Sequence, residues 1–261
     1  MSESMHPALG HWCWPELATP DLDSAKAFYG SLFGWEALEV PSAQGAYVIF
    51  NLEGRPCGGA YRIDAEQAAR GLRVQWRNYV KVASADRAAE RVKELGGSVV
   101  AGPFDVEGVG RMASVKDPAG VGFALWQDGT HPGLTLQGVA GAPCWTERMA
   151  RDAGAAKAFF TGLFGWTARD KDDFGFTYTE FHLGDTPVGG LMPMAGPEWE
   201  GLPDHFMQYF LVDDCDASAA RAAELGGKVC VPGCDIPTVG RFAILEDPQG
   251  GTFAILQPVQ M

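Results

Sequence analysis

The chain has 261 residues, and its 33 acidic and 20 basic side chains give a formal net charge of −13. This acidic balance argues against nucleic acid and anionic membranes as partners, because both require a basic surface. With 46% apolar positions the composition is that of a soluble globular protein, and the length predicts two domains.

A helix and a strand are the first predicted elements. Residues 24–32 carry apolar side chains at the spacing of one helix face, and the pattern ends at Gly34. Asp21 or Asp23 supplies the start signal, because an aspartate side chain accepts the free N–H groups of a first turn. Residues 46–52 follow with the composition of a strand.

The next elements complete one structural unit and begin another. A Gly58-Gly59 pair precedes a second predicted helix over residues 85–95. Strands are expected near 112–115 and 122–126, separated by an Asp-Pro-Ala-Gly turn at 117–120. The order of strand, helix and several strands occurs twice here, so the unit is βαβββ.

The whole pattern then repeats. Residues 13–35 (CWPELATPDLDSAKAFYGSLFGW) recur as residues 144–166 (CWTERMARDAGAAKAFFTGLFGW), and the block that starts at Tyr79 recurs 130 residues later. One chain therefore carries two copies of one module. We place the modules at residues 1–133 and 140–261. Residues 129–143, which overlap the ends of both modules, are read as the linker that joins them.

The ordered motifs AKAFYGSLFGW, ADRAAERVKELGG and KDPAGVGFALWQ each have a counterpart in the second module. Together they resemble the vicinal oxygen chelate superfamily of glyoxalases, bleomycin-resistance proteins and dioxygenases. Within it the chain is similar to tandem actinobacterial proteins described as glyoxalase-like or as hydroxylases, a group that includes a mycobacterial antigen. The resemblance implies an α+β fold, in which four βαβββ units form two modules with cupped mixed sheets.

The resemblance also implies a metal site in each cup, with a His or Gln on the first strand, a His on the fifth and a Glu on the eighth. The equivalent positions hold non-ligands, namely Trp14, Arg77 and Ala124 in the first module and Trp145, Met207 and Ala254 in the second. Shifts of two positions reach Glu16, Gln75, Glu147 and His205. A third strong ligand is still missing, so we predict no metal and no cofactor.

Strand alternation predicts which side chains line the cup of the first module (cup 1) and of the second (cup 2). Cup 1 receives Trp14, Glu16, Arg77, Tyr79, Ala124 and Trp126, and cup 2 receives Trp145, Glu147, His205, Met207 and Tyr209. Cys13 and Leu17 are assigned to the helix-covered face. Aromatic walls with few polar groups suit an organic ligand, although the same aromatics also suit a plug that merely fills the cup.

Two pairs of polar residues have alternative interpretations. Arg111 and Arg241 either contact a ligand or the cup glutamates, or form a structural salt bridge to the aspartate of the following Asp-Pro turn. The salt bridge is favoured. Glu16 and Glu147 act as general bases with raised pKa, or stay permanently paired with an arginine. His205 is more typical of a structural residue than of a base.

The two cups differ at one position. Arg77 in cup 1 has Met207 as its counterpart in cup 2, so the first cup is suited to an anionic or carbonyl group. The remaining histidines lie outside the predicted sites: His6, His11 and His131 at module edges and His182 on an outer strand. The cups are therefore expected to differ in ligand, or one of them is vestigial.

Cellular location follows from features that the sequence lacks. Apolar runs such as residues 46–50 are far shorter than the roughly 18 residues of a membrane span, and residues 1–10 do not resemble a signal peptide. The six cysteines form no CxxC pair, so we expect reduced, mostly buried thiols. A cytoplasmic protein is predicted, as a monomer with paired modules or as a homodimer.

Three functions remain at this point. The first is metal-free binding of a small aromatic or amphipathic organic molecule, in resistance, sequestration or accessory biosynthesis. The second is a glyoxalase-like lyase or isomerase, or a hydroxylase-type enzyme, with a non-standard site. The third is a scaffold with filled cups.

Overall fold

The computed structural model describes residues 7–42, 45–106, 108–172 and 175–259. Module 1 contains β1 (Trp12–Thr19), α1 (Leu22–Phe33), β2 (Glu36–Ser42), β3 (Gly45–Leu52), β4 (Arg55–Arg62), α2 (Ala65–Ala69), β5 (Gln75–Lys81), α3 (Ala85–Glu94), β6 (Ser98–Val106), β7 (Gly110–Lys116) and β8 (Gly122–Asp128). Module 2 contains β9 (Pro143–Ala150), α4 (Ala153–Phe164), β10 (Thr167–Lys171), β11 (Tyr178–Leu183), β12 (Thr186–Pro193), the 3-10 turn η1 (Pro197–Trp199), β13 (His205–Leu211), α5 (Cys215–Glu224), β14 (Lys228–Ile236), β15 (Gly240–Glu246) and β16 (Thr252–Pro258).

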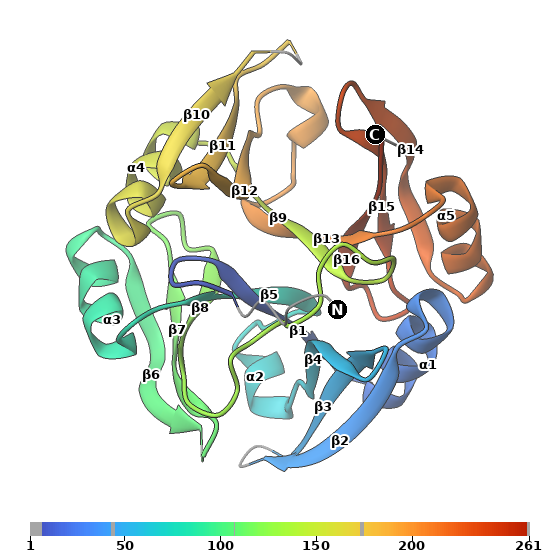
Figure 1. Ribbon diagram of the computed structural model, residues 1–261, viewed down its shortest axis with the longest axis horizontal. Helices are drawn as coiled ribbons and strands as arrows, with labels where there is room; N and C mark the ends of the chain where they lie inside the picture. Colours follow the sequence, from blue (N-terminus) through green and yellow to red (C-terminus); the bar gives the residue numbers. More distant parts are fainter. Residues whose placement is uncertain (1–6, 43–44, 107, 173–174, 260–261) are drawn as a thin grey trace.

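Each module forms one mixed sheet of eight strands, in the order β2-β3-β4-β1-β5-β8-β7-β6 and the equivalent β10-β11-β12-β9-β13-β16-β15-β14. The central pair β1 and β5 is antiparallel, whereas β4 runs parallel to β1 and β8 runs parallel to β5. Two βαβββ units therefore meet at the centre of each sheet. The predicted α+β fold with four units and two cupped sheets is confirmed (Figure 1).

Local signals explain where the first helix begins and ends. Asp21 is the N-cap of α1, and its carboxylate accepts the backbone N–H groups of Asp23 and Ser24. Gly34 ends the helix in the left-handed conformation with φ of 73°, which glycine adopts at little cost. The predicted helix over 24–32 lies inside the observed one, and Asp21 is the start signal of the two that were considered.

The helix-covered faces of the sheets form two cores that each combine both modules. In the first core, Tyr29 and Trp76 of module 1 pack against Phe253 and Phe210 of module 2. In the second core, residues of β5, α3, β7 and β8 pack against residues of α4, β11 and β12. Figure 1 shows the result, with α1 beside α5 on one side of the molecule and α3 beside α4 on the other.

The opposite faces form a separate cluster in each module, and these are the two cups. Trp14, Tyr79, Ala124 and Trp126 cluster in cup 1, and Met207, Tyr209 and Ala254 cluster with Trp145 in cup 2. The assignment of Cys13 to the helix-covered face is wrong. Cys13 packs in the cup 1 cluster, because the register of β1 shifts between Trp12 and Trp14.

Two sequence expectations concern the chain as a whole. Among the described helices, none is long and apolar enough to cross a membrane. The cysteines are free thiols, and three of them, Cys13, Cys57 and Cys215, are buried, whereas Cys230 and Cys234 are exposed on β14.

Candidate functional site

A buried glutamate lies at the floor of cup 2 and receives two tyrosine hydroxyls. Tyr178 donates to Glu147 Oε1 at 2.7 Å, and Tyr209 donates to Oε2 at 2.9 Å. Trp145 completes the set, because its Nε1 donates to the Tyr178 oxygen at 3.1 Å. We call these four residues clamp 2.

Cup 1 repeats the arrangement, as clamp 1. Tyr79 donates to Glu16 Oε2 at 2.8 Å, and Tyr47 also hydrogen-bonds the Glu16 carboxylate. Trp14 Nε1 donates to the Tyr47 oxygen at 2.9 Å. A Trp–Tyr–Glu–Tyr chain of hydrogen bonds is therefore built once in each module.

The strand register explains how the clamps form. Trp14 lies opposite Tyr79 and Trp145 lies opposite Tyr209 on the central antiparallel pairs, so three of the four clamp residues come from neighbouring strands. The fourth, a tyrosine, comes from β3 or β11, one strand further away. It has to reach over β4 or β12 to meet the glutamate.

Glycine makes that reach possible. Gly59 pairs with Glu16 on β4, and Gly190 pairs with Glu147 on β12. A Cβ atom at Gly59 would lie 2.1 Å from the Tyr47 hydroxyl oxygen, and one at Gly190 would lie 1.8 Å from that of Tyr178. The phenol thus occupies the space that any other side chain would fill.

The clamps hold polar groups in a dry environment. Burial raises the pKa of Glu16 and of Glu147, while hydrogen bonds from the tyrosines lower it in both cups and the charge of Arg77 lowers it in cup 1. Burial and the neighbouring carboxylate raise the pKa of Tyr79 and Tyr209 well above its ordinary value. The phenols therefore remain protonated donors at neutral pH.

The cups differ around their clamps, as the sequence predicts. Arg77 lies opposite Glu16, and its charge acts on Tyr61 and Tyr79, whereas Met207 occupies the same register position opposite Glu147. Cup 2 is rich in methionine, and its cluster contains Met149, Met192, Met194 and Met207. Cup 1 therefore has an arginine beside its glutamate, whereas the wall around Glu147 in cup 2 is lined by adaptable methionines.

His131 was predicted to lie outside the cups, but the structure places it in cup 1. It was expected at a module edge, but its ring packs edge-to-face on Trp14 with the ring centres 4.6 Å apart, and it also contacts Trp126. Trp126 Nε1 donates to the His131 carbonyl oxygen at 2.9 Å. The linker thus lies on cup 1.

Arg111 and Arg241 have partners that neither interpretation included. Arg111 pairs with Asp86 at the start of α3 and with Asp105 on β6, both at 2.8 Å. Arg241 forms the equivalent pairs, with Asp216 and Asp235. The predicted contacts with a cup glutamate or with the Asp-Pro turn are therefore wrong, because each arginine pairs with a helix and a neighbouring strand on the outer surface.

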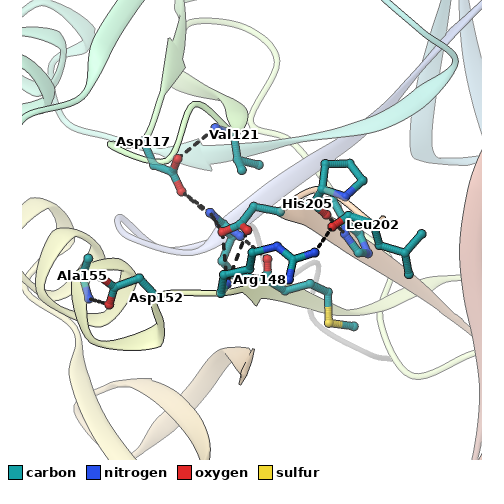
Figure 2. Close-up of polar contacts among 11 residues, drawn as sticks. Asp117, Val121, Arg148, Asp152, Ala155, Leu202 and His205 are labelled. Carbon is teal, nitrogen blue, oxygen red and sulfur yellow. Dashed lines mark hydrogen bonds and ion pairs between the residues drawn. The ribbon is translucent and has the colours of Figure 1, made fainter. Parts of the chain in front are cut away.

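The turn aspartates instead connect the modules. Asp117 of module 1 accepts a hydrogen bond at 2.9 Å from Arg148 of module 2, and both side chains are only 1% exposed (Figure 2). Asp247 of module 2 accepts one at 2.9 Å from Tyr29 of module 1. The aspartate of each Asp-Pro turn is therefore bound by the opposite module.

His205 lies at the start of β13, near this connection. Its Nδ1 is 2.8 Å from the Pro203 carbonyl oxygen. Burial lowers its pKa, and the charge of Arg148 adds to this effect. Figure 2 shows His205 beside the Arg148 network. Its hydrogen bond is to the backbone, which agrees with a structural role.

The residues present do not fit the divalent metal that the resemblance implies. Each clamp offers a single carboxylate, already bonded to two protonated phenols, and Arg77 adds a cation beside one of them. Over the described ranges, no group of three or more His, Cys, Asp or Glu side chains is placed to hold a metal ion. Oxygen-rich or imidazole-rich ligand sets are what such ions require.

Metal analysis tests this conclusion. We expect the purified protein, washed with a weak chelator, to contain no stoichiometric Zn, Ni, Fe or Mn by plasma mass spectrometry. The reason is that Trp14, Arg77, Ala124, Trp145, Met207 and Ala254 stand at the ligand positions. Close to one equivalent of any of these metals per module would contradict it.

Comparisons with known proteins agree with the geometry. The family model of the Glyoxalase/Bleomycin resistance protein/Dioxygenase superfamily matches residues 8–125 and 145–255. CFP32 of Mycobacterium tuberculosis (strain CDC 1551 / Oshkosh), which carries the provisional name of a glyoxylase, is 38% identical over 248 residues, or 94% of each chain. The anthracycline biosynthesis protein DnrV of Streptomyces peucetius is 35% identical over 262 residues, covering 96% of this chain and 94% of its own.

Solved structures share the fold at low identity. The Mn(II)-bound glyoxalase of Novosphingobium aromaticivorans is 18% identical with a TM-score of 0.65, over 95% of this chain and 81% of its own. The 2,3-dioxygenase LapB of Pseudomonas sp. KL28 is 13% identical with a TM-score of 0.65, over 96% of this chain and 93% of its own.

Proposed function

The chain belongs to the Glyoxalase/Bleomycin resistance protein/Dioxygenase superfamily, and we propose that within it the protein binds a planar aromatic or amphipathic organic molecule without a metal. The biological setting would be resistance, sequestration or an accessory step of biosynthesis. The clamp at the floor of each cup is the observation that carries the proposal.

Filling a cup with a buried carboxylate is energetically unfavourable compared with filling it with apolar side chains. Taking Glu16 or Glu147 out of water costs free energy that apolar side chains of similar volume would not cost. The same Trp–Tyr–Glu–Tyr chain is nevertheless built in both modules. A recurrent polar group surrounded by aromatic and apolar walls is typical of a site that orients a ligand.

The clamp assigns a role to each of its members. The indole N–H of Trp145 is bonded to Tyr178, which fixes the ring plane against which an aromatic ligand would stack. Glu147 and the tyrosine oxygens would then accept or share a hydrogen bond with a hydroxyl or carbonyl group of that ligand. One relative is named for the biosynthesis of anthracyclines, which are fused-ring aromatic compounds.

Fluorescence titration tests the proposal. A panel of hydroxylated anthraquinones and related planar aromatics should quench tryptophan emission and raise the melting temperature, because ligand bound only to the folded state stabilises it. An aromatic contact contributes about 0.5 to 1.5 kcal/mol beyond its buried area, so loss of the critical Trp ring should weaken binding up to roughly tenfold. A broad panel that produces neither quenching nor a thermal shift would instead support the filled-cup scaffold.

A further inference from the structure

We propose that cup 2 is the cup that binds ligand, and that cup 1 is closed by the linker, whose His131 ring occupies the position of a ligand ring against Trp14. The inference rests on the proposed function and narrows its ligand to a neutral, hydroxylated planar molecule. It follows from what covers each cup and from how the charges within each cup are balanced.

The linker is fixed on cup 1 by its backbone. The Leu134 N–H donates to the Cys13 carbonyl at 2.8 Å, and the His131 N–H donates to the Val109 carbonyl at 3.1 Å. Gly133 has φ of 97°, and a Cβ atom there would lie 2.6 Å from the Cys13 carbonyl oxygen. This segment is thus held in close contact with the strand that carries Trp14.

His131 makes the contacts expected of an aromatic ligand. Its ring lies edge-to-face on Trp14 and near Trp126, and both tryptophans are only 6% exposed. Burial lowers the pKa of His131, which favours the neutral ring. The aromatic wall of cup 1 is therefore already covered by the protein itself.

The polar groups of cup 1 also satisfy one another. Glu16 is bonded to both clamp tyrosines and lies beside the Arg77 charge, which also acts on Tyr61. Carboxylate and guanidinium therefore compensate each other within the cup. An incoming ligand would have to break these contacts and displace the linker.

Cup 2 has the same clamp bonds, but its covering and its charge differ. Trp199 of η1 packs against its cluster, where cup 1 has the linker. The clamp tryptophan, Trp145, is only partly buried, as are Met192 and Phe242 of the same cluster. The cluster side chains Met207 and Met192 stand where cup 1 has Arg77 and Tyr61. Methionine side chains rearrange readily, so this wall can adapt to a ligand.

Charge selects the class of ligand. Glu147 accepts hydrogen bonds from Tyr178 and Tyr209, and its register partner Met207 is uncharged. An anionic ligand would meet the carboxylate without a compensating cation. A neutral ring bearing a hydroxyl group can donate to Glu147 and stack on Trp145, which is the combination that this cup offers.

The experiment uses the intact chain labelled with 5-fluorotryptophan. Its eight tryptophan ¹⁹F resonances can be assigned by single Trp→Phe variants. With 1,8-dihydroxyanthraquinone as the probe, we expect one equivalent to bind and the Trp145 resonance to shift while that of Trp14 stays in place. A sulfonated anthraquinone should bind at least tenfold more weakly.

Two variants distinguish closure of cup 1 by His131 from ligand binding in cup 2. His131→Ala should admit a second equivalent of probe and make the Trp14 resonance respond, whereas Trp145→Phe should weaken the first site. A Trp14 shift in the unmodified chain, or a His131→Ala variant that still binds one equivalent, would overturn this inference and leave the proposed function standing. Absence of any binding to the unmodified chain would overturn both.

Discussion

Replacing Arg148 with Leu should lower the free energy of unfolding by about 3 to 5 kcal/mol, because it leaves Asp117 as a buried charge without its partner. Arg148 and Asp117 are each 1% exposed, and their charged atoms lie 2.8 Å apart. A second carboxylate, Asp204, lies 3.1 Å from the same guanidinium. Leu is the informative substitution, since Leu17 occupies the equivalent position in module 1.

Urea denaturation with matched variants measures this effect. Arg148→Leu combined with Asp117→Asn should recover much of the loss, because removing both charges leaves no uncompensated ion and Asn keeps an acceptor for the Val121 N–H. Arg241→Leu is the surface control, since Arg241 pairs with exposed aspartates and should matter far less. Equal losses for Arg148→Leu and Arg241→Leu would show that the buried pair does not connect the modules energetically.

Replacing Gly190 with Ala should break clamp 2. The added Cβ would lie 1.8 Å from the Tyr178 oxygen and 3.0 Å from Trp145 Nε1, so the phenol has to leave and Glu147 keeps only Tyr209 as a donor. A buried acceptor that loses a partner costs about 1 to 3 kcal/mol. We expect that loss of stability, together with a changed near-ultraviolet circular dichroism signal from Trp145 and loss of ligand binding in cup 2.

The control is another strand glycine, Gly122. A Cβ atom there would come no closer than 3.9 Å to Val115, so Gly122→Ala should leave the clamp unchanged. Gly59→Ala should have the same effect on clamp 1, because its Cβ would lie 2.1 Å from the Tyr47 oxygen. If Gly190→Ala and Gly122→Ala have indistinguishable spectra and stabilities, the path of Tyr178 over β12 is not what holds Glu147.

The fold was predictable because it follows from local sequence signals, such as helix ends, and from a repeated sequence pattern. The offset between residues 13–35 and 144–166 reveals the duplication, and Asp21 and Gly34 mark the ends of α1 in the sequence itself. Alternation also placed Tyr79 and Tyr209 in the cups, since both lie on regular central strands. Helix ends and side-chain alternation are properties of single elements, so the periodicity of the sequence predicts them directly.

What sequence reasoning missed depends on contacts across elements. Tyr47 and Tyr178 reach the glutamates over an intervening strand, and only their common 131-residue offset and the nearby glycine pairs hinted at this. His131 lies in a linker, whose path no periodicity encodes. The partner of Arg111 could not be predicted either, because Asp86 lies on a helix. The alternation of side chains along the strand of Arg111 does not indicate which helix lies near it.

The two cores between the modules have a consequence for folding cooperativity. Each core combines half of one module with half of the other, so neither module can lose its structure without exposing apolar surface in both. The module boundary between residues 133 and 140 therefore divides the sequence into two repeats, but it does not divide the protein into two units of independent stability. Because the linker keeps the partners at high effective concentration, we expect the chain to unfold as one cooperative unit of two repeats and not as two independent domains.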